Sequence, residues 1–172
     1  MKKVIIFYML LDIGICVELP EGKRDQIFFV FLLANLFLNY DTGVIPASLL
    51  EIIKEIPLTF SEQALIGSLV YLGLSFASLF VSILFNKFGA AKVCGYVLFL
   101  NSCSCFLFSF TKDKYTMYFT RILMGMTESF IVIYGPVWVN NYSPPEHSTK
   151  WMGILHSSSA IGNTLYSLIK YK

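Results

Sequence analysis

Three ionisable residues stand inside long apolar stretches and are the first candidates for chemistry. Asp41 interrupts one stretch, and Arg121 and Glu128 interrupt another. A charge surrounded by apolar groups is unfavourable unless it is paired, hydrogen-bonded or able to lose its proton. These residues therefore predict a site for solute binding, proton transfer or a buried ion pair.

The spacing of Arg121 and Glu128 limits the kinds of ligand binding and proton transfer that these residues could support. Seven residues separate them, which on a helix is about 10.5 Å along nearly one face. That is too far for a direct pair, and Gly125 lies between them as an open notch. A face of this kind suits a ligand with an anionic head, or a carboxylate that exchanges a proton as its cationic neighbour moves. The alternative is a fixed network of Asp41, Arg121 and Glu128 that only sets helix packing.

The composition indicates which environment holds these charges. The 172 residues carry a net charge of +2, with 14% charged and 56% hydrophobic residues, and the mean hydropathy is +0.66. Soluble domains carry about 25% charged residues. A soluble enzyme of this composition would need a largely apolar surface. The chain also lacks the basic surplus that nucleic-acid binding requires. We therefore expect a multi-pass membrane protein with lipids as partners.

Metal and cofactor chemistry are not expected from this sequence. Cys16 and Cys94 are isolated, and Cys103 and Cys105 would point to nearly opposite sides of one helix. The four thiols therefore predict neither a metal site nor a disulfide framework, and no cofactor is predicted.

Charge-free stretches of about 20 residues predict the helices that position the site. We expect an all-α, polytopic protein with about five spans. The predicted spans are residues 27–50, 63–85, 93–110, 115–139 and 151–169. Residues 26–172 form one bundle in this prediction, whereas residues 1–25 are signal-like or interfacial.

Lys and Arg in the loops predict the orientation of these spans, because such residues favour the cytoplasmic side. Five of them fall on one side: Lys23, Arg24, Lys87, Lys92 and Lys150. Lys54, Lys112 and Lys114 fall on the other side, so the first span is expected to start in the cytoplasm. Asp41 and Arg121 then both lie about 21 Å from the cytoplasmic edge, and should face each other.

Four further positions in the spans are predicted to kink or loosen helices. They are Gly43, Pro46, Gly125 and Pro136. Helices that open in this way are common in transporters, although packing alone could also place such residues. His156 is expected to be a packing residue.

Two segments resemble the major facilitator superfamily. RILMGMTESF, from Arg121 to Phe130, is similar to the fourth helix of its spinster-like branch, where an Arg, a Gly and a Glu recur at this spacing. NYDTGVIP, from Asn39 to Pro46, is similar to a first-helix segment of that branch. In this sequence the Tyr and Asp are adjacent, and Thr42 stands where the branch has Arg.

The stretch SILFNKFGAAK is similar to the loop between the second and third helices of that superfamily. Lys87 and Gly89 match the pattern, and Asn86 replaces its acidic residue. The resemblance implies that Asn86, Lys87 and Gly89 form a conformational gate loop. Without the acid, the charge-based latch of that loop is in question.

The resemblance implies a secondary transporter, coupled to protons, for a small organic or lipid-like solute. Asp41, Arg121 and Glu128 would bind the solute or the proton. Such transporters have twelve helices, so the chain would be most of an amino-terminal six-helix half, truncated and needing the other half or a partner chain. The alternative is a non-transporting scaffold or degenerate half-transporter.

We expect no enzyme, because neither a Gly-x-Ser-x-Gly nor a His-Glu-x-x-His motif occurs. Plasma and endolysosomal membranes are not distinguished.

Overall fold

The computed structural model describes residues 21–170 and is all-α. Five long helices are joined by short connections, with one turn of 3-10 helix before the last. The elements are α2 (Glu21–Glu55), α3 (Phe60–Phe88), α4 (Ala90–Phe110), α5 (Lys114–Tyr142), η1 (Pro145–His147) and α6 (Ser148–Lys170). The predicted all-α class is confirmed.

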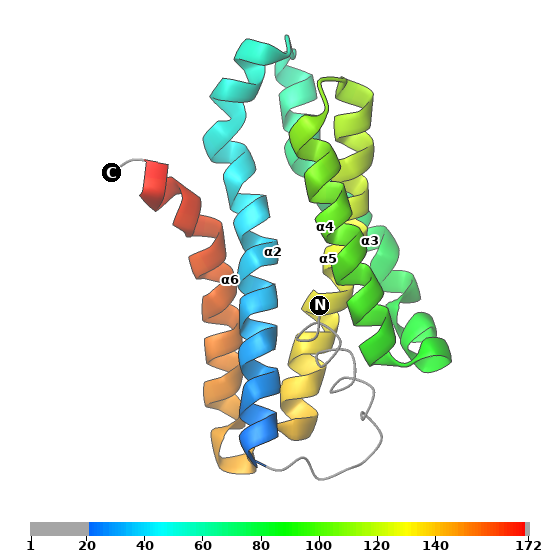
Figure 1. Cartoon of the computed structure of the whole chain (residues 1–172), viewed down its shortest axis with the longest axis vertical. Helices are drawn as coiled ribbons and strands as arrows, with labels where there is room; N and C mark the ends of the chain where they lie inside the picture. Colours follow the sequence, from blue (N-terminus) through cyan, green and yellow to red (C-terminus); the bar gives the residue numbers. More distant parts are fainter. Residues whose placement is uncertain (1–20, 171–172) are drawn as a thin grey trace.

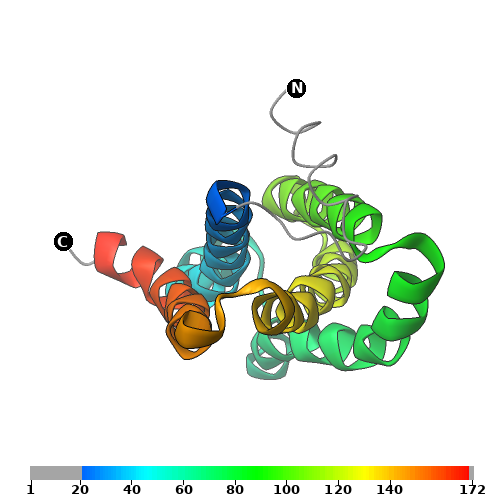
Figure 2. The ribbon, with the colours of Figure 1, turned by 90° about the horizontal axis from the view of Figure 1, so that it is seen from below.

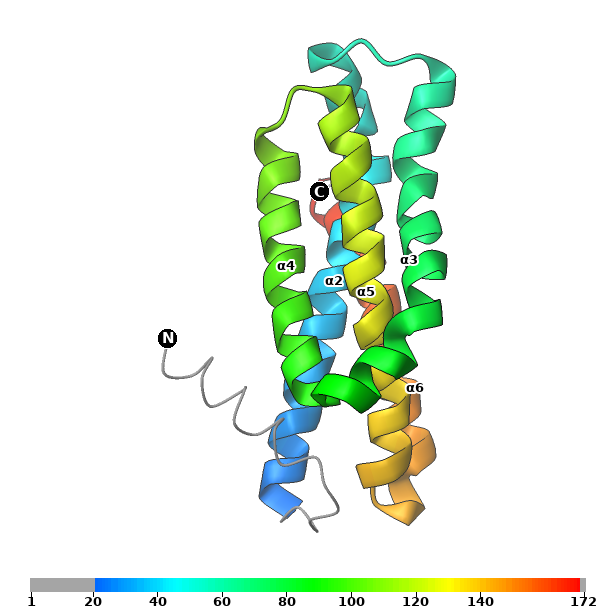
Figure 3. The same ribbon diagram turned by 90° about the vertical axis from the view of Figure 1, so that its right-hand side faces the viewer.

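The helices pack in two groups. α2 lies along α6, while α3 and α4 both lie along α5 (Figure 1). Seen from below, α5 stands between the α2–α6 pair and the other two helices (Figure 2). Figure 3 shows α3, α4 and α5 side by side, with α2 behind them. Helix α5 touches all four other long helices.

Glycines set the closest contacts within each group. A methyl group at Gly125 of α5 would collide with the backbone carbonyl of Val70 on α3, and one at Gly73 would collide with that of Ile122. Gly43 on α2 meets α6 in the same way. Small residues at helix crossings let backbones approach closely in membranes. The notch predicted at Gly125 is therefore not open, because the backbone of α3 fills it.

Local signals explain where α3 and α5 begin and end. The Thr59 hydroxyl accepts a hydrogen bond from the Glu62 N–H, and the Glu62 carboxylate accepts one from the Thr59 N–H, which completes a capping box. Asp113 caps α5 by accepting from the Thr116 N–H, which lowers the pKa of the Asp113 carboxyl. α3 ends at Gly89, whose φ of 82° favours glycine.

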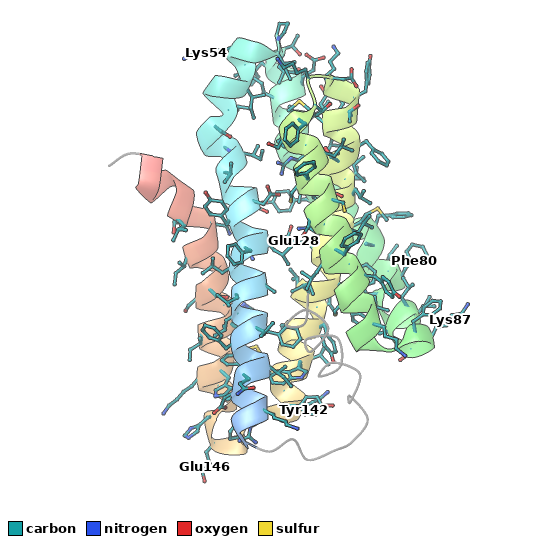
Figure 4. The ribbon with its side chains drawn as sticks, in the orientation of Figure 1. Lys54, Phe80, Lys87, Glu128, Tyr142 and Glu146 are labelled. Carbon is teal, nitrogen blue, oxygen red and sulfur yellow. The ribbon has the colours of Figure 1, made fainter. Side chains whose placement is uncertain are left out.

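Different interactions stabilise the two ends of the bundle. At one end, the Lys114 ammonium and the Glu62 carboxylate lie 2.7 Å apart and join α5 to α3. At the other end, aromatic rings stack between α2, α5 and α6. The centroid distances are 4.2 Å for Phe28–Trp151, 6.3 Å for Trp138–Trp151 and 5.4 Å for Trp138–Tyr142. Lys54 and Tyr142 mark these opposite ends in Figure 4.

Within residues 21–170, four helices are long and apolar enough to cross a membrane. They cover Lys23–Pro46, Phe60–Phe88, Lys92–Phe110 and Lys114–Tyr142. Large side chains such as Phe37, Phe99 and Phe106 are two-thirds exposed, as lipid-facing residues are. The fifth predicted span forms α6, but α6 is not among the four candidates in the described part of the chain. Its middle is polar, with Ser157 to Ser159 and Asn163.

The structure also bears on the predicted amino-terminal segment and on the two predicted proline kinks. Of the predicted segment 1–25, residues 1–20 lie outside the described residues, and 21–25 form the first turn of α2. Pro46 lies inside α2 and Pro136 inside α5, and both helices continue through them. The prolines therefore interrupt neither helix, and kinks at these positions stay a prediction.

The contact at Gly125 generates a test of the packing. Gly125→Ala should separate α3 from α5 and lower the free energy of unfolding by about 1–3 kcal/mol, because the methyl group meets rigid backbone. The matched control is Gly67→Ala on α3, where nothing lies within 4 Å; its effect should stay within about 1 kcal/mol. Denaturation in mixed micelles measures both. Equal stability of the two variants would contradict the packing.

Candidate functional site

Arg121 is the most deeply buried charge of the described chain. Its side chain is 2% exposed, and it stands on α5 one turn before Gly125. The guanidinium carbon lies 4.1 Å from the centre of the Phe108 ring of α4. This stacking fixes the plane of the guanidinium and adds a cation–π attraction. The Arg121 charge is thus held at a defined position between α4 and α5.

Asp41 of α2 is the partner of this charge. Its Oδ2 lies 3.6 Å from Nη1 of Arg121, and its side chain is 27% exposed. The expectation that Asp41 and Arg121 face each other is confirmed. The distance is that of a loose ion pair and is longer than a hydrogen bond between ionised groups.

A cavity of about 440 Å³ adjoins the ion pair. Both Asp41 and Arg121 line it. The other lining residues are Tyr40, Val44, Ile45, Ser48, Ile52, Ile56, Cys105, Phe108, Ser109, Thr111 and Met117. They come from α2, α4 and α5 and from the turn before α5. Cavities that bind small molecules have about this volume and combine an apolar lining with a few polar groups.

Glu128 lies on α5 near mid-height of the bundle (Figure 4). Its carboxylate forms no hydrogen bond or ion pair with residues 21–170, and it is within electrostatic range of Asp41 and Arg121. It does not line the cavity beside the ion pair. The structure thus joins Asp41 to Arg121 and leaves Glu128 as a separate carboxylate nearby.

The sequence interpretation missed the polar groups that α4 contributes. Cys105 lines the cavity beside Asp41, and the Cys105 sulfur accepts a hydrogen bond from the Asn101 amide at 3.8 Å. Asn101 also accepts a hydrogen bond of 2.8 Å from the Thr127 hydroxyl of α5. Asn101 and Cys105 are four residues apart, so one face of α4 presents both toward the site. That spacing in an apolar span is the signal that could have found them.

A second polar cluster joins α2 to α6. The buried Asn35 amide donates to the Leu155 carbonyl and to the hydroxyls of Ser158 and Ser159, at 3.0, 3.0 and 2.7 Å. A small cavity of about 140 Å³ adjoins the cluster, and His156 is one of its lining residues. The Asn35 amide explains why the polar middle of α6 packs against α2.

The predicted gate loop is short and exposed. Asn86 and Lys87 end α3, and Gly89 alone separates α3 from α4. The Lys87 ammonium lies 5.4 Å from the centre of the Phe88 ring. Lys87 lies in the same half of the bundle as Tyr142 (Figure 4). The role of these residues in gating stays a prediction.

Among the described residues, no three His, Cys, Asp or Glu side chains gather closely enough to hold a metal ion. The site consists of one cation, two carboxylates, a thiol and several hydroxyls beside an apolar cavity.

Comparison with known proteins places the chain in a family. The Major Facilitator Superfamily profile matches residues 28–170. The chain is 26% identical over 127 residues to the "Probable metabolite transport protein CsbC" of Bacillus subtilis (strain 168), covering 72% of this chain and 27% of that protein. It is 25% identical over 149 residues to "Synaptic vesicle glycoprotein 2B" of Rattus norvegicus, covering 84% and 22% respectively. No solved structure matches the chain significantly.

The ion pair generates a second prediction. Asp41→Ala leaves the Arg121 charge without its partner and should lower the free energy of unfolding by about 3 kcal/mol. Removing both charges, as in Asp41→Ala with Arg121→Met, should recover much of that loss. The control is Lys114→Gln, which breaks a partly exposed pair and should leave the free energy of unfolding nearly unchanged.

Reversible unfolding in mixed micelles measures all three variants. Equal losses for Asp41→Ala and Lys114→Gln would show that the buried pair does not hold α2 to α5.

Proposed function

The chain belongs to the Major Facilitator Superfamily, and on this premise we propose that it forms part of a secondary active transporter for a small organic solute. Membership makes the protein a multi-pass membrane protein of a transporter family. The solute, the coupling ion and the residues that act on them belong to the proposal.

The observation that carries the proposal is the Asp41–Arg121 pair beside the cavity of about 440 Å³. Ionisable residues inside membrane spans mark solute pathways and proton relays by default. Helix packing needs only small residues, which the glycine contacts supply. A charged pair that lines a cavity is better explained by a ligand than by packing.

In this proposal Arg121 attracts the solute, Asp41 balances its charge, and Glu128 responds to protons. Glu128 supports the last role because it is near the other two charges and has no ion-pair partner among residues 21–170. The printed name of the Bacillus relative, a metabolite transport protein, favours a small solute. The resemblance of residues 121–130 to the spinster-like branch favours an organic-anion or lipid-like one.

Transport in this proposal needs a second helical bundle. The chain spans 27% and 22% of the lengths of the two relatives. Transporters of this kind move two bundles about a central site. We propose that the second bundle is supplied by a partner chain or by further residues of the same polypeptide. If no solute moves across the membrane, the scaffold alternative gains support instead.

The third prediction tests the proton role of Glu128. Proteoliposomes that contain the protein together with its second bundle, and an internal pH indicator, are given an inward proton gradient and a panel of sugars, amino acids and organic acids. Glu128→Gln keeps the shape of the side chain and removes its titration, so solute-dependent proton entry should fall to background while expression is unchanged.

The control is Glu146→Gln, an exposed carboxylate at the Tyr142 end of the bundle, which should behave as wild type (Figure 4). A Glu128→Gln protein that keeps the wild-type pH dependence would contradict the assignment.

A further inference from the structure

The Arg121 guanidinium has donors that the ion pair does not use. Nη1 faces Asp41, whereas Nε and Nη2 are buried and have no hydrogen-bond partner among residues 21–170. Leaving buried donors unsatisfied is unfavourable, and more so for charged groups. These two donors are therefore available to a ligand.

The two free donors lie on one edge of the guanidinium. The N–H groups of Nε and Nη2 are parallel, and their separation matches the two oxygens of a carboxylate, so the edge binds that group through two hydrogen bonds. The guanidinium carbon lies 4.1 Å from the centre of the Phe108 ring, and Arg121 is one of the residues that line the cavity. An ammonium group has no acceptor for these donors, and a neutral amide offers one acceptor oxygen where a carboxylate offers two.

The neighbouring charges limit the ligand to no more than a single negative charge. From α2, Asp41 and Tyr40 lie at the site; from α4, Cys105; and from α5, Glu128 lies within electrostatic range. Arg121 is the one cation among these groups and already faces one carboxylate. A dianion would add a second excess negative charge in a water-poor environment, which is unfavourable.

The other residues that line the cavity indicate the chemistry of the rest of the ligand. Val44, Ile45, Ile52, Ile56 and Met117 give it an aliphatic lining. The Ser48 and Ser109 hydroxyls are also part of the lining. Since apolar surfaces favour apolar ligands, this lining suits a short hydrocarbon body attached to the anionic group.

We propose that the free Nε–Nη2 edge of Arg121 binds the carboxylate of a small organic monoanion, whose aliphatic body lies in the cavity between α2, α4 and α5. This inference rests on the proposed function and names its substrate class. Asp41 is then a competitor of the ligand, because both place negative charge beside one guanidinium.

Hexanoate is the probe, and hexanamide is its neutral counterpart. Binding of labelled hexanoate to the protein in nanodiscs is measured by equilibrium dialysis at neutral pH. Hexanoate should bind saturably, and neither hexanamide nor inorganic phosphate should displace it. Arg121→Lys keeps the charge but loses the two-donor edge, and should weaken binding about tenfold or more.

Two further variants separate binding from folding. Val44→Phe fills the cavity, leaves both charges in place, and should abolish binding. Asp41→Asn removes the competing charge and should strengthen binding several-fold, which a merely structural Asp41 would not do. Lys150→Gln, an exposed cation, is the control and should bind as wild type.

The inference is overturned if hexanamide or phosphate competes as well as hexanoate, or if Arg121→Lys and Val44→Phe bind normally. Solute-driven proton entry that is restricted to sugars or amino acids would also overturn it while supporting the proposed function. Hexanoate binding with the expected variant pattern supports the inference even where no solute is transported. A failure of the inference can therefore be distinguished from a failure of the proposed transport function.

Discussion

The burial of one guanidinium within a lipid-spanning bundle constrains the rest of the molecule. Arg121 is 2% exposed on a helix whose length and composition fit a membrane span. Its charge requires an anion nearby, and α2 supplies Asp41. Two residues of α4 complete its surroundings: Phe108 lies against the guanidinium, and Cys105 lines the cavity beside the carboxylate. Three helices thus have to meet at one depth, and a cavity is left beside them.

The pair also lies between two units that are packed separately. α2 is held to α6 through Gly43 and Asn35, and α5 is held to α3 through Gly73 and Gly125. Contact between α2 and α5 is much less extensive. A loose ion pair at this boundary can change its partners with little disturbance of either unit. In the proposed function, the Asp41–Arg121 contact, rather than the tightly packed glycine crossings, is therefore the place where solute binding would alter the structure.

Charge and hydropathy predicted much of this arrangement, because a charge in lipid and a run of apolar side chains are strong local constraints. The helices and the facing of Asp41 and Arg121 follow from them. The role of Gly125 does not, since a glycine on a helix face indicates neither an open notch nor a neighbouring backbone until the crossing with α3 is known. The contacts of Cys105 and Asn101 depend on the rotation of α4 about its axis. The sequence does not determine that rotation, because the side chains on α4 that could fix it are only weakly polar. The polar middle of α6 lowers its hydropathy, so the helix was placed correctly but is not a candidate span.

The central claim is that Asp41 and Arg121 form one charged centre inside the membrane. An experimental structure of the protein in lipid nanodiscs measures it most directly. We expect the Asp41 carboxylate to lie about 3.6 Å from the Arg121 guanidinium, within direct contact or one bridging water, with both side chains facing the cavity. Two side chains that point to lipid, or that lie more than about 10 Å apart and beyond the reach of a bridging water, would contradict it.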